Sequence, residues 1–207
     1  MVSATPRWAS FLVASVCARY HVSQPTLRWR NALDYPSAIW ITTGDYNPTS
    51  TTVTIYASGV PLTNRINLIH ELAHHIHFLR TSRDDHSELF WRYCWTLYRL
   101  YSIPLHAAVL SEFAYMARSE QVLLSMGVRL SPQARLAAAL GRSLRAQANL
   151  QTRVRSLRTR LSTLRSPRKR TTLRRSLRPL ILQAASVERV QARHARAYKR
   201  VARNLSV

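Results

Sequence analysis

Charge is distributed very unequally along this chain, and the imbalance limits the folds open to it. The chain carries 31 Lys+Arg against 9 Asp+Glu, a formal net charge of +22. Residues 129–207 hold 21 of the basic residues and a single acid, Glu188, whereas residues 1–128 have a net charge of only +2. Such an asymmetry indicates two parts with different partners. We therefore predict two domains, at residues 1–128 and 129–207.

The basic part is predicted to form long helices. Gly and Pro are rare in it, and apolar residues recur at alternating spacings of four and three over residues 150–164 and again over 173–187. This spacing is typical of a heptad seam. The segment 166–170 interrupts the pattern, so two helices joined at Pro167 are predicted to fold back as an antiparallel hairpin or coiled-coil arm.

The charge of this arm predicts a nucleic-acid partner. It exceeds what solubility requires, and arginine makes bidentate contacts to phosphate. Tyr198 is the only aromatic residue of the arm, so we expect binding to the DNA or RNA backbone rather than base stacking. An acidic protein, an anionic membrane surface and self-association through the leucine seam are the alternatives. The residues predicted to bind nucleic acid are Arg153, Arg155, Arg158, Arg160, Arg165, Arg168, Lys169, Arg170, Arg174, Arg175 and Arg178.

Residues 1–128 are predicted to fold as a small α+β domain with a short mixed sheet. Its predicted strands are β-branched or alternating segments, and its predicted helices carry apolar residues at helical spacing. Thr63 or Asn64 is predicted to cap the second helix, and Gly44–Pro48 is predicted to be a turn or loop. The predicted helices span 6–20, 64–80, 86–101 and 104–127, and the predicted strands span 26–30, 38–42 and 51–57.

The second of these helices carries the segment His70-Glu71-Leu72-Ala73-His74. Two histidines four residues apart lie on the same helix face and can hold one metal ion through their ring nitrogens. In an HExxH arrangement the intervening glutamate acts as general base toward a zinc-activated water. We therefore predict one bound Zn²⁺, with Glu71 as the catalytic base of a hydrolase that acts on proteins or peptides.

A catalytic zinc needs a third protein ligand. His86, at the start of the next predicted helix, is favoured. Glu112 is the alternative ligand, or else a hydrogen-bond partner for the free ring nitrogen of a ligand histidine. His75 and His77 are predicted to be bystanders on other faces of the helix, and Asp84 and Asp85 to be loop or helix-start charges.

A peptidase also needs a group that stabilises the oxyanion and a surface that holds the substrate. Tyr115, Tyr93 and Arg92 are candidates for the first role, and the sequence does not rank them. For the second, the strand at 51–57 is predicted to be the sheet edge that pairs with an extended peptide.

The segment HELAHHIHF, followed by a short loop and by His86-Ser87-Glu88-Leu89-Phe90-Trp91, resembles the SprT-like metallopeptidases and related metallopeptidases of actinobacteria and their phages. Those proteins have HELAH and then an H-G-x-x-F/W segment that opens a helix and supplies the third ligand. The segment 126–129 is also similar, the resemblance covers residues 26–129, and Ser87 stands where glycine is usual. It implies a zincin-like fold, action on DNA-associated proteins, and a site formed by His70, Glu71, His74 and His86.

The cysteines and the lengths of the apolar stretches indicate the cellular compartment. Cys17 and Cys94 are far apart and form no motif, which argues against a disulfide scaffold and favours a reducing compartment. No stretch of about 20 apolar residues is present, so no transmembrane segment is expected. We predict a cytoplasmic protein, associated with the virion if it is encoded by a phage.

The alternative function is a structural or nucleic-acid-associated protein, such as a phage-particle component, on a protease-like fold with a non-catalytic zinc site.

Overall fold

A computed structural model describes residues 4–31, 44–164 and 166–204 of the chain. These residues form seven helices and one small sheet of three strands. The predicted combination of helices with a short mixed sheet is therefore confirmed. Among the described residues, no helix is both long enough and apolar enough to cross a membrane.

The sheet consists of β1 (Thr26–Asn31), β2 (Gly44–Asn47) and β3 (Thr52–Ala57), in the order β1-β3-β2. β3 pairs in parallel with β1 and antiparallel with β2. Two of the predicted strands are thus confirmed, and the one at 38–42 lies outside the described residues. The prediction that 51–57 is a sheet edge is wrong, because β3 has a partner strand on each side.

The predicted turn at Gly44–Pro48 is also wrong, because its first four residues form β2. Tyr46 faces Val53 across the antiparallel pair and its side chain is buried. Burial of this aromatic ring outweighs the turn preference of the neighbouring Gly, Asp and Asn residues. The turn itself comes later, at residues 48–51.

Helix α1 (Arg7–Tyr20) packs against helix α2 (Pro61–Thr81), which also contacts β2 and β3. α2 begins with proline at its first position, where no intrahelical donor is lost. The cap residue is Val60, so the predicted capping roles of Thr63 and Asn64 are both wrong. The side chain of Asn64 instead holds the preceding loop, accepting from the backbone N–H of Ser58 at 2.8 Å and donating to the carbonyl of Ser58 at 2.9 Å.

Three shorter helices complete the first part: α3 (Glu88–Leu100), α4 (Leu105–Tyr115) and α5 (Ala117–Ser125). The prediction of one continuous helix over 104–127 is wrong, since the backbone becomes extended at Met116. The carbonyl of Glu112 keeps its helical partner, the backbone N–H of Met116, at 2.9 Å. The buried hydroxyl of Ser119 lies 2.9 Å from this carbonyl and 2.7 Å from that of Met116, so it links the start of α5 to the end of α4.

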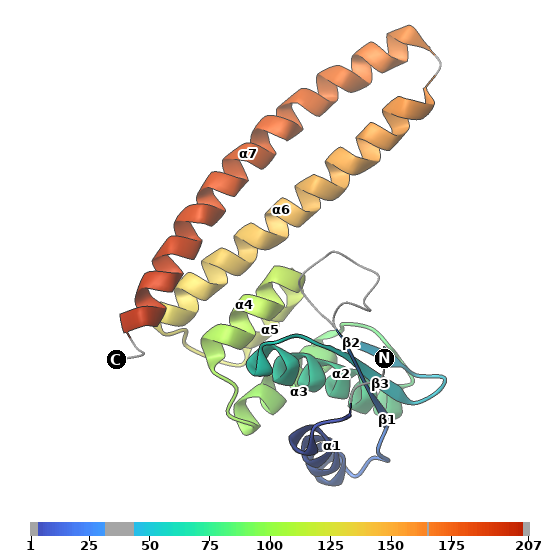
Figure 1. Cartoon of the computed structure of the whole chain (residues 1–207), viewed down its shortest axis with the longest axis vertical. Helices are drawn as coiled ribbons and strands as arrows, with labels where there is room; N and C mark the ends of the chain where they lie inside the picture. The colour runs from blue at the N-terminus through green and yellow to red at the C-terminus, as the bar shows by residue number, and fades with distance from the viewer. Residues whose placement is uncertain (1–3, 32–43, 165, 205–207) are drawn as a thin grey trace.

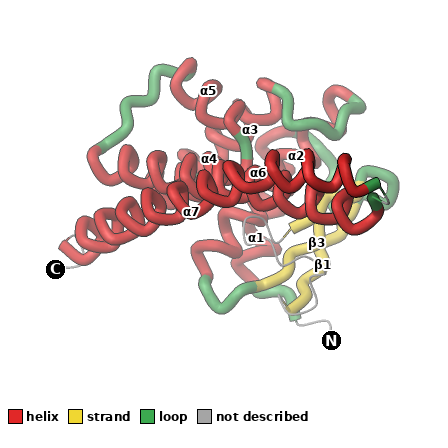
Figure 2. Tube along the Cα trace, turned by 90° about the horizontal axis from the view of Figure 1, so that it is seen from above, coloured by secondary structure: helices red, strands yellow, loops and turns green. Residues whose placement is uncertain are grey.

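The chain ends in two long helices, α6 (Pro132–Thr163) and α7 (Pro167–Asn204), which lie side by side and run in opposite directions (Figures 1 and 2). The beginning of α6 packs on α4. At Gly141 this packing is so close that an added Cβ would lie 3.1 Å from the backbone nitrogen of Ala114. Farther out, the seam residues of both helices are only half-buried, with Leu150 the last fully buried one on α6.

Candidate metal centre and basic arm

The HELAH segment lies in the buried middle of α2. His70 is 2% exposed and His74 is 8% exposed, because this stretch of the helix is enclosed by the sheet on one side and by α3 on another. His86 precedes α3 by two residues and approaches from the loop that follows α2. The three histidines predicted as ligands are therefore brought together from two segments of the chain.

The Nε2 atoms of these histidines converge. Nε2 of His86 lies 3.2 Å from Nε2 of His70 and 3.1 Å from Nε2 of His74, and the potential ligand atoms all lie within 4.8 Å of one another. A tetrahedral zinc with Zn–N bonds of about 2.0–2.1 Å separates its nitrogen ligands by about 3.3–3.4 Å. The spacing of the imidazoles fits that ion.

The opposite ring nitrogens of two of these histidines face carboxylates. Nδ1 of His70 lies 3.3 Å from Oε1 of Glu112, and Nδ1 of His74 lies 2.8 Å from Oδ1 of Asp84. A hydrogen bond from Nδ1 of His70 to Glu112 favours the tautomer in which Nδ1 carries the proton, so the Nε2 lone pair is left for a metal. Asp84 is close to His74 but does not form a hydrogen bond with its Nδ1. Glu112 thus has the second of its two predicted roles, that of a hydrogen-bond partner for a ring nitrogen of His70. The contact between Asp84 and His74 was not predicted from the sequence.

Burial and charge set the protonation of the three imidazoles. Burial, together with the neighbouring histidines, lowers the pKa of His74 to about 2 and that of His86 to about 4. Burial alone would also lower the pKa of His70, but the charge of Glu112 outweighs it and raises this pKa well above the ordinary value. Two of the rings are therefore neutral, and a metal must displace a proton from the third.

A second group of potential ligands lies on the other side of His70 and consists of His70, Cys94 and Glu112. This group would use Nδ1 of His70, which Glu112 already engages. Burial raises the pKa of the Cys94 thiol to about 11, and the thiol form is a poor metal ligand. Oε1 of Glu112 also accepts a hydrogen bond from the buried hydroxyl of Tyr98. The group is better described as support for His70 than as a second metal site.

Glu71 follows His70 on α2 and lies against β2, which is an outer strand of the sheet within the described residues. Its side chain is 4% exposed, and burial raises its pKa to about 7. A Cβ added to Gly44 of β2 would lie 2.6 Å from Oε1 of Glu71, so glycine is needed there for the carboxylate to occupy its position. A carboxyl group that titrates near neutrality can both accept and return a proton.

The loop between α2 and α3 is held by a further histidine of α2. Nε2 of His77 lies 2.9 Å from Oγ of Ser87, and this hydroxyl also accepts from the backbone N–H of Phe90 as the cap of α3. The prediction that His77 is a bystander thus overlooked a structural role next to His86. The other predicted bystander, His75, contacts the carbonyl of Ser23 at 2.7 Å and is buried away from the three Nε2 atoms.

The three residues predicted as candidates for stabilising the oxyanion differ in their distance from the histidine cluster. The ring of Tyr115 lies 5.0 Å from that of His86 and 5.7 Å from that of His70, measured between centroids. Tyr93 instead makes an edge-to-face contact with Tyr20 at the end of α1, and Arg92 pairs with Glu88 on the surface of α3 at 2.8 Å. Of the three, Tyr115 is the one beside the histidines.

The basic residues predicted to bind nucleic acid lie on the outer half of the α6–α7 hairpin. Ten of the eleven are exposed, and the eleventh, Arg165, is outside the described residues. Among the residues that the structure describes, none of the ten forms an ion pair, whereas Arg142, nearer the base of the arm, pairs with Glu120 of α5. The ten are Arg153, Arg155, Arg158, Arg160, Arg168, Lys169, Arg170, Arg174, Arg175 and Arg178.

No protein-family model, curated protein or solved structure gives a significant match to this chain. The resemblance to SprT-like metallopeptidases therefore stays a prediction, based on the HELAH segment and the later histidine. The evidence on function therefore comes from the site itself, in which the buried His70 and His74 and the half-buried His86 form a cluster that could hold a metal ion.

Proposed function

We propose that this protein is a zinc-dependent peptidase whose basic arm brings it to nucleic acid. The observation that carries the proposal is the convergence of three Nε2 atoms, with those of His70 and His74 at 3.2 and 3.1 Å from that of His86, and with Glu112 hydrogen-bonded to the opposite nitrogen of His70. Orienting carboxylates of this kind accompany metal-bound histidines in proteins and fix both tautomer and ring direction.

In this proposal His70, His74 and His86 hold the ion through Nε2. Zinc bound there supplies a Lewis acid and makes water a usable nucleophile at neutral pH. The carboxylate of Glu71 accepts the proton of the attacking water and returns it to the leaving amine. Tyr115, whose ring lies 5.0 Å from that of His86, would donate its hydroxyl proton toward the developing oxyanion. Phe90 and Trp91 pack against the histidine rings and exclude water from around them.

Three protein ligands favour catalysis over a purely structural role. Structural zinc sites are closed by four protein ligands, whereas catalytic sites have three and an open position. Glu112, the one residue considered as a fourth ligand, is directed at Nδ1 of His70 and is not grouped with the other two histidines. A zinc that only stabilised the fold would also have no use for a buried Glu71.

The sheet supports an extended peptide as substrate. Within the part of the chain that the structure describes, β2 is the outer strand on the side of Glu71, and its Gly44 touches the carboxylate. A peptide that paired with β2 by strand addition would pass next to the catalytic base. This assigns to β2 the substrate-binding role that the sequence had suggested for β3.

Nucleic-acid binding is supported by the ten exposed basic residues of the outer hairpin and by the absence of acidic residues from 129–187. Phosphate contacts by unpaired arginines release counterions and give affinity without sequence preference. A protease held in this way would act on proteins that are themselves bound to DNA or RNA.

The test combines metal content with turnover. We expect about one zinc per chain, measured by elemental analysis, with the zinc lost in His86→Ala and kept in His106→Ala, a matched histidine outside the cluster. Casein cleavage should require Glu71 and be stimulated by DNA. Glu71→Gln should abolish it while zinc is retained, and Glu88→Gln, at an exposed glutamate, should not change it. Zinc binding without any Glu71-dependent cleavage of casein or of DNA-bound protein would refute the peptidase.

A further inference from the structure

The charge of α7 is interrupted in its middle. Residues 179–187 contain no charged side chain, although basic residues are dense before and after them. The stretch begins with Pro179, which lies inside the helix. A helix whose only task was to contact phosphates would gain nothing from an uncharged segment of this length.

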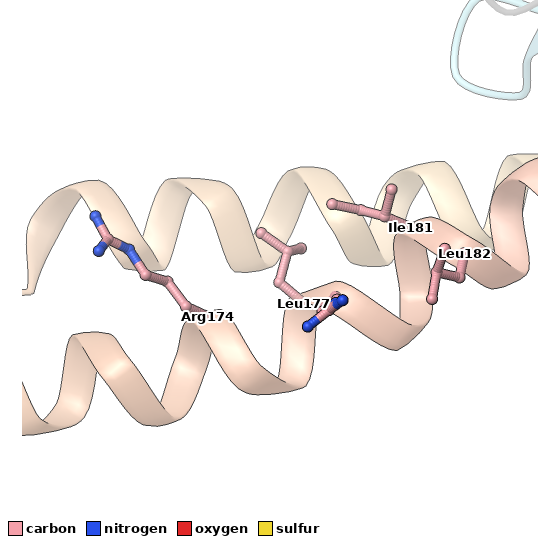
Figure 3. A pocket seen from close by; sticks show the side chains of 5 residues that line it. Arg174, Leu177, Ile181 and Leu182 are labelled. Atoms are coloured by element: carbon pink, nitrogen blue, oxygen red, sulfur yellow. The ribbon is translucent and has the colours of Figure 1, made fainter.

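Next to this interruption α7 carries a small groove with an apolar floor. It is lined by Arg174, Leu177, Arg178, Ile181 and Leu182 and has a volume of about 190 Å³. Figure 3 shows these side chains following one another along the helix, with Arg174 at one end and Leu182 at the other. Their spacing of i, i+3, i+4, i+7 and i+8 places all five on one face of two successive turns.

The hairpin does not cover this face. Ile181 is 43% exposed and Leu182 is 65% exposed, and Leu177 is only half-buried although it also belongs to the seam with α6. Two packed helices leave the flank of their seam open, and a third helix is the element that closes such a flank in a bundle. The apolar side chains at helical spacing, next to the partly exposed contact between α6 and α7, thus form a surface on which one more helix can pack.

The charges around the groove decide what kind of helix fits. Arg174 and Arg178 border the apolar residues, and residues 129–187 contain no acid that could neutralise them. A second copy of this chain also carries a net charge of +22, and the repulsion between the two copies makes this groove a poor homodimer interface. We propose that the groove binds an acidic amphipathic helix of another protein, with leucine-like residues on Leu177, Ile181 and Leu182 and carboxylates on the two arginines.

This proposal is independent of the metal centre and is tested on the full-length protein with synthetic helices. Three fluorescent peptides of about three heptads share one design. The first has a leucine seam with glutamate flanks, the second the same seam with lysine flanks, and the third glutamate flanks with alanine in the seam. Binding is followed by fluorescence anisotropy at about 0.15 M salt, where charges farther apart than about 8 Å are screened.

We expect the leucine–glutamate peptide to bind at least about tenfold more tightly than either of the others, because only it buries apolar area and pairs charges together. The double variant Ile181→Gln/Leu182→Gln should lose that advantage. Val190→Gln is the matched control, since Val190 is also 43% exposed on α7 but lies outside the groove. Circular dichroism should show unchanged helix content, because the replaced side chains are largely exposed.

Three results would overturn the proposal. Equal affinity for the two glutamate peptides would mean that charge alone attracts them. Sedimentation of the protein as a dimer that dissociates in Ile181→Gln/Leu182→Gln would assign the groove to a second copy. If Ile181→Gln/Leu182→Gln weakens binding of duplex DNA as much as it weakens binding of the peptide, while Val190→Gln does not, the groove is part of the nucleic-acid surface.

Discussion

The contact between Gly44 and Glu71 can be tested by adding a single methyl group. In Gly44→Ala the new Cβ would lie 2.6 Å from Oε1, 2.7 Å from Cγ and 3.0 Å from Cδ of Glu71. The carboxylate must move, and burial on all sides leaves it little room. Overpacking of this kind costs about 1–3 kcal/mol, whereas replacing glycine by alanine within a strand returns about 0.5–1 kcal/mol of backbone entropy. We expect a net loss of about 1 kcal/mol in the free energy of unfolding.

The two effects are separated by repeating the change in a Glu71→Ala background. The backbone gain is the same in both backgrounds, but the clash is absent when Cγ, Cδ and Oε1 are removed. Gly44→Ala should therefore stabilise the Glu71→Ala protein slightly, and the coupling energy of the cycle should be about 1–3 kcal/mol. The assay is urea unfolding of the four proteins with chelator present, followed by circular dichroism.

A glycine without neighbours provides the control. A Cβ added to Gly59 meets nothing within 4 Å, so Gly59→Ala should have the same effect in both backgrounds. Gly44→Ala should also keep its zinc, because it touches none of the histidines, while casein cleavage falls about a hundredfold or more through displacement of the base. Equal effects of Gly44→Ala in the two backgrounds would refute the placement of Glu71 under β2.

Three further predictions concern the metal and the arm. Glu112→Gln should weaken zinc binding about 10–100-fold, measured by competition with a chromogenic chelator, and an unchanged affinity would remove its orienting role. Zinc affinity should fall as pH is lowered from about 8 to 6, since the raised pKa of His70 means that a proton competes for the ring; calorimetry in buffers of different ionisation enthalpy should detect the released proton. Arg174→Gln/Arg175→Gln should reduce the slope of log K against log salt for duplex DNA by about 1.8, while Arg118→Gln, at an exposed arginine of α5, should leave it unchanged.

Local spacing was enough to predict the part of the site that lies on one helix. His70 and His74 are four residues apart, so any helix over this segment brings them to the same face. Strands β1 and β3 were likewise predicted from alternation and β-branched residues, which are local signals. The hairpin could be anticipated because both segments repeat one apolar spacing and because Pro167, at which the second helix begins, interrupts it.

What the sequence did not reveal depends on contacts between distant segments. Asp84 reads as a polar loop residue, and only the folding of its loop onto α2 brings it 2.8 Å from His74. β2 has the composition of a turn, and its strand conformation depends on pairing with β3 and on burial of Tyr46. At the break between α4 and α5, Ser119 similarly contacts carbonyls seven and three residues earlier, which its place in the sequence does not reveal.

Helix α4 makes the main contact between the first part of the molecule and the long helix α6. On one face it carries Glu112, which contacts His70 in the metal centre. On another it receives α6 so closely that Gly141 has no room for a side chain, and Arg145 of α6 donates to the carbonyl of Phe113, the residue after Glu112. Close-packed backbones transmit displacement better than flexible side chains do. The arm is therefore built onto the helix that supports His70, a proposed zinc ligand. If nucleic acid or a protein binds along α6 and α7, we expect the force on the arm to reach the backbone that positions this histidine, which a flexible tether would not allow.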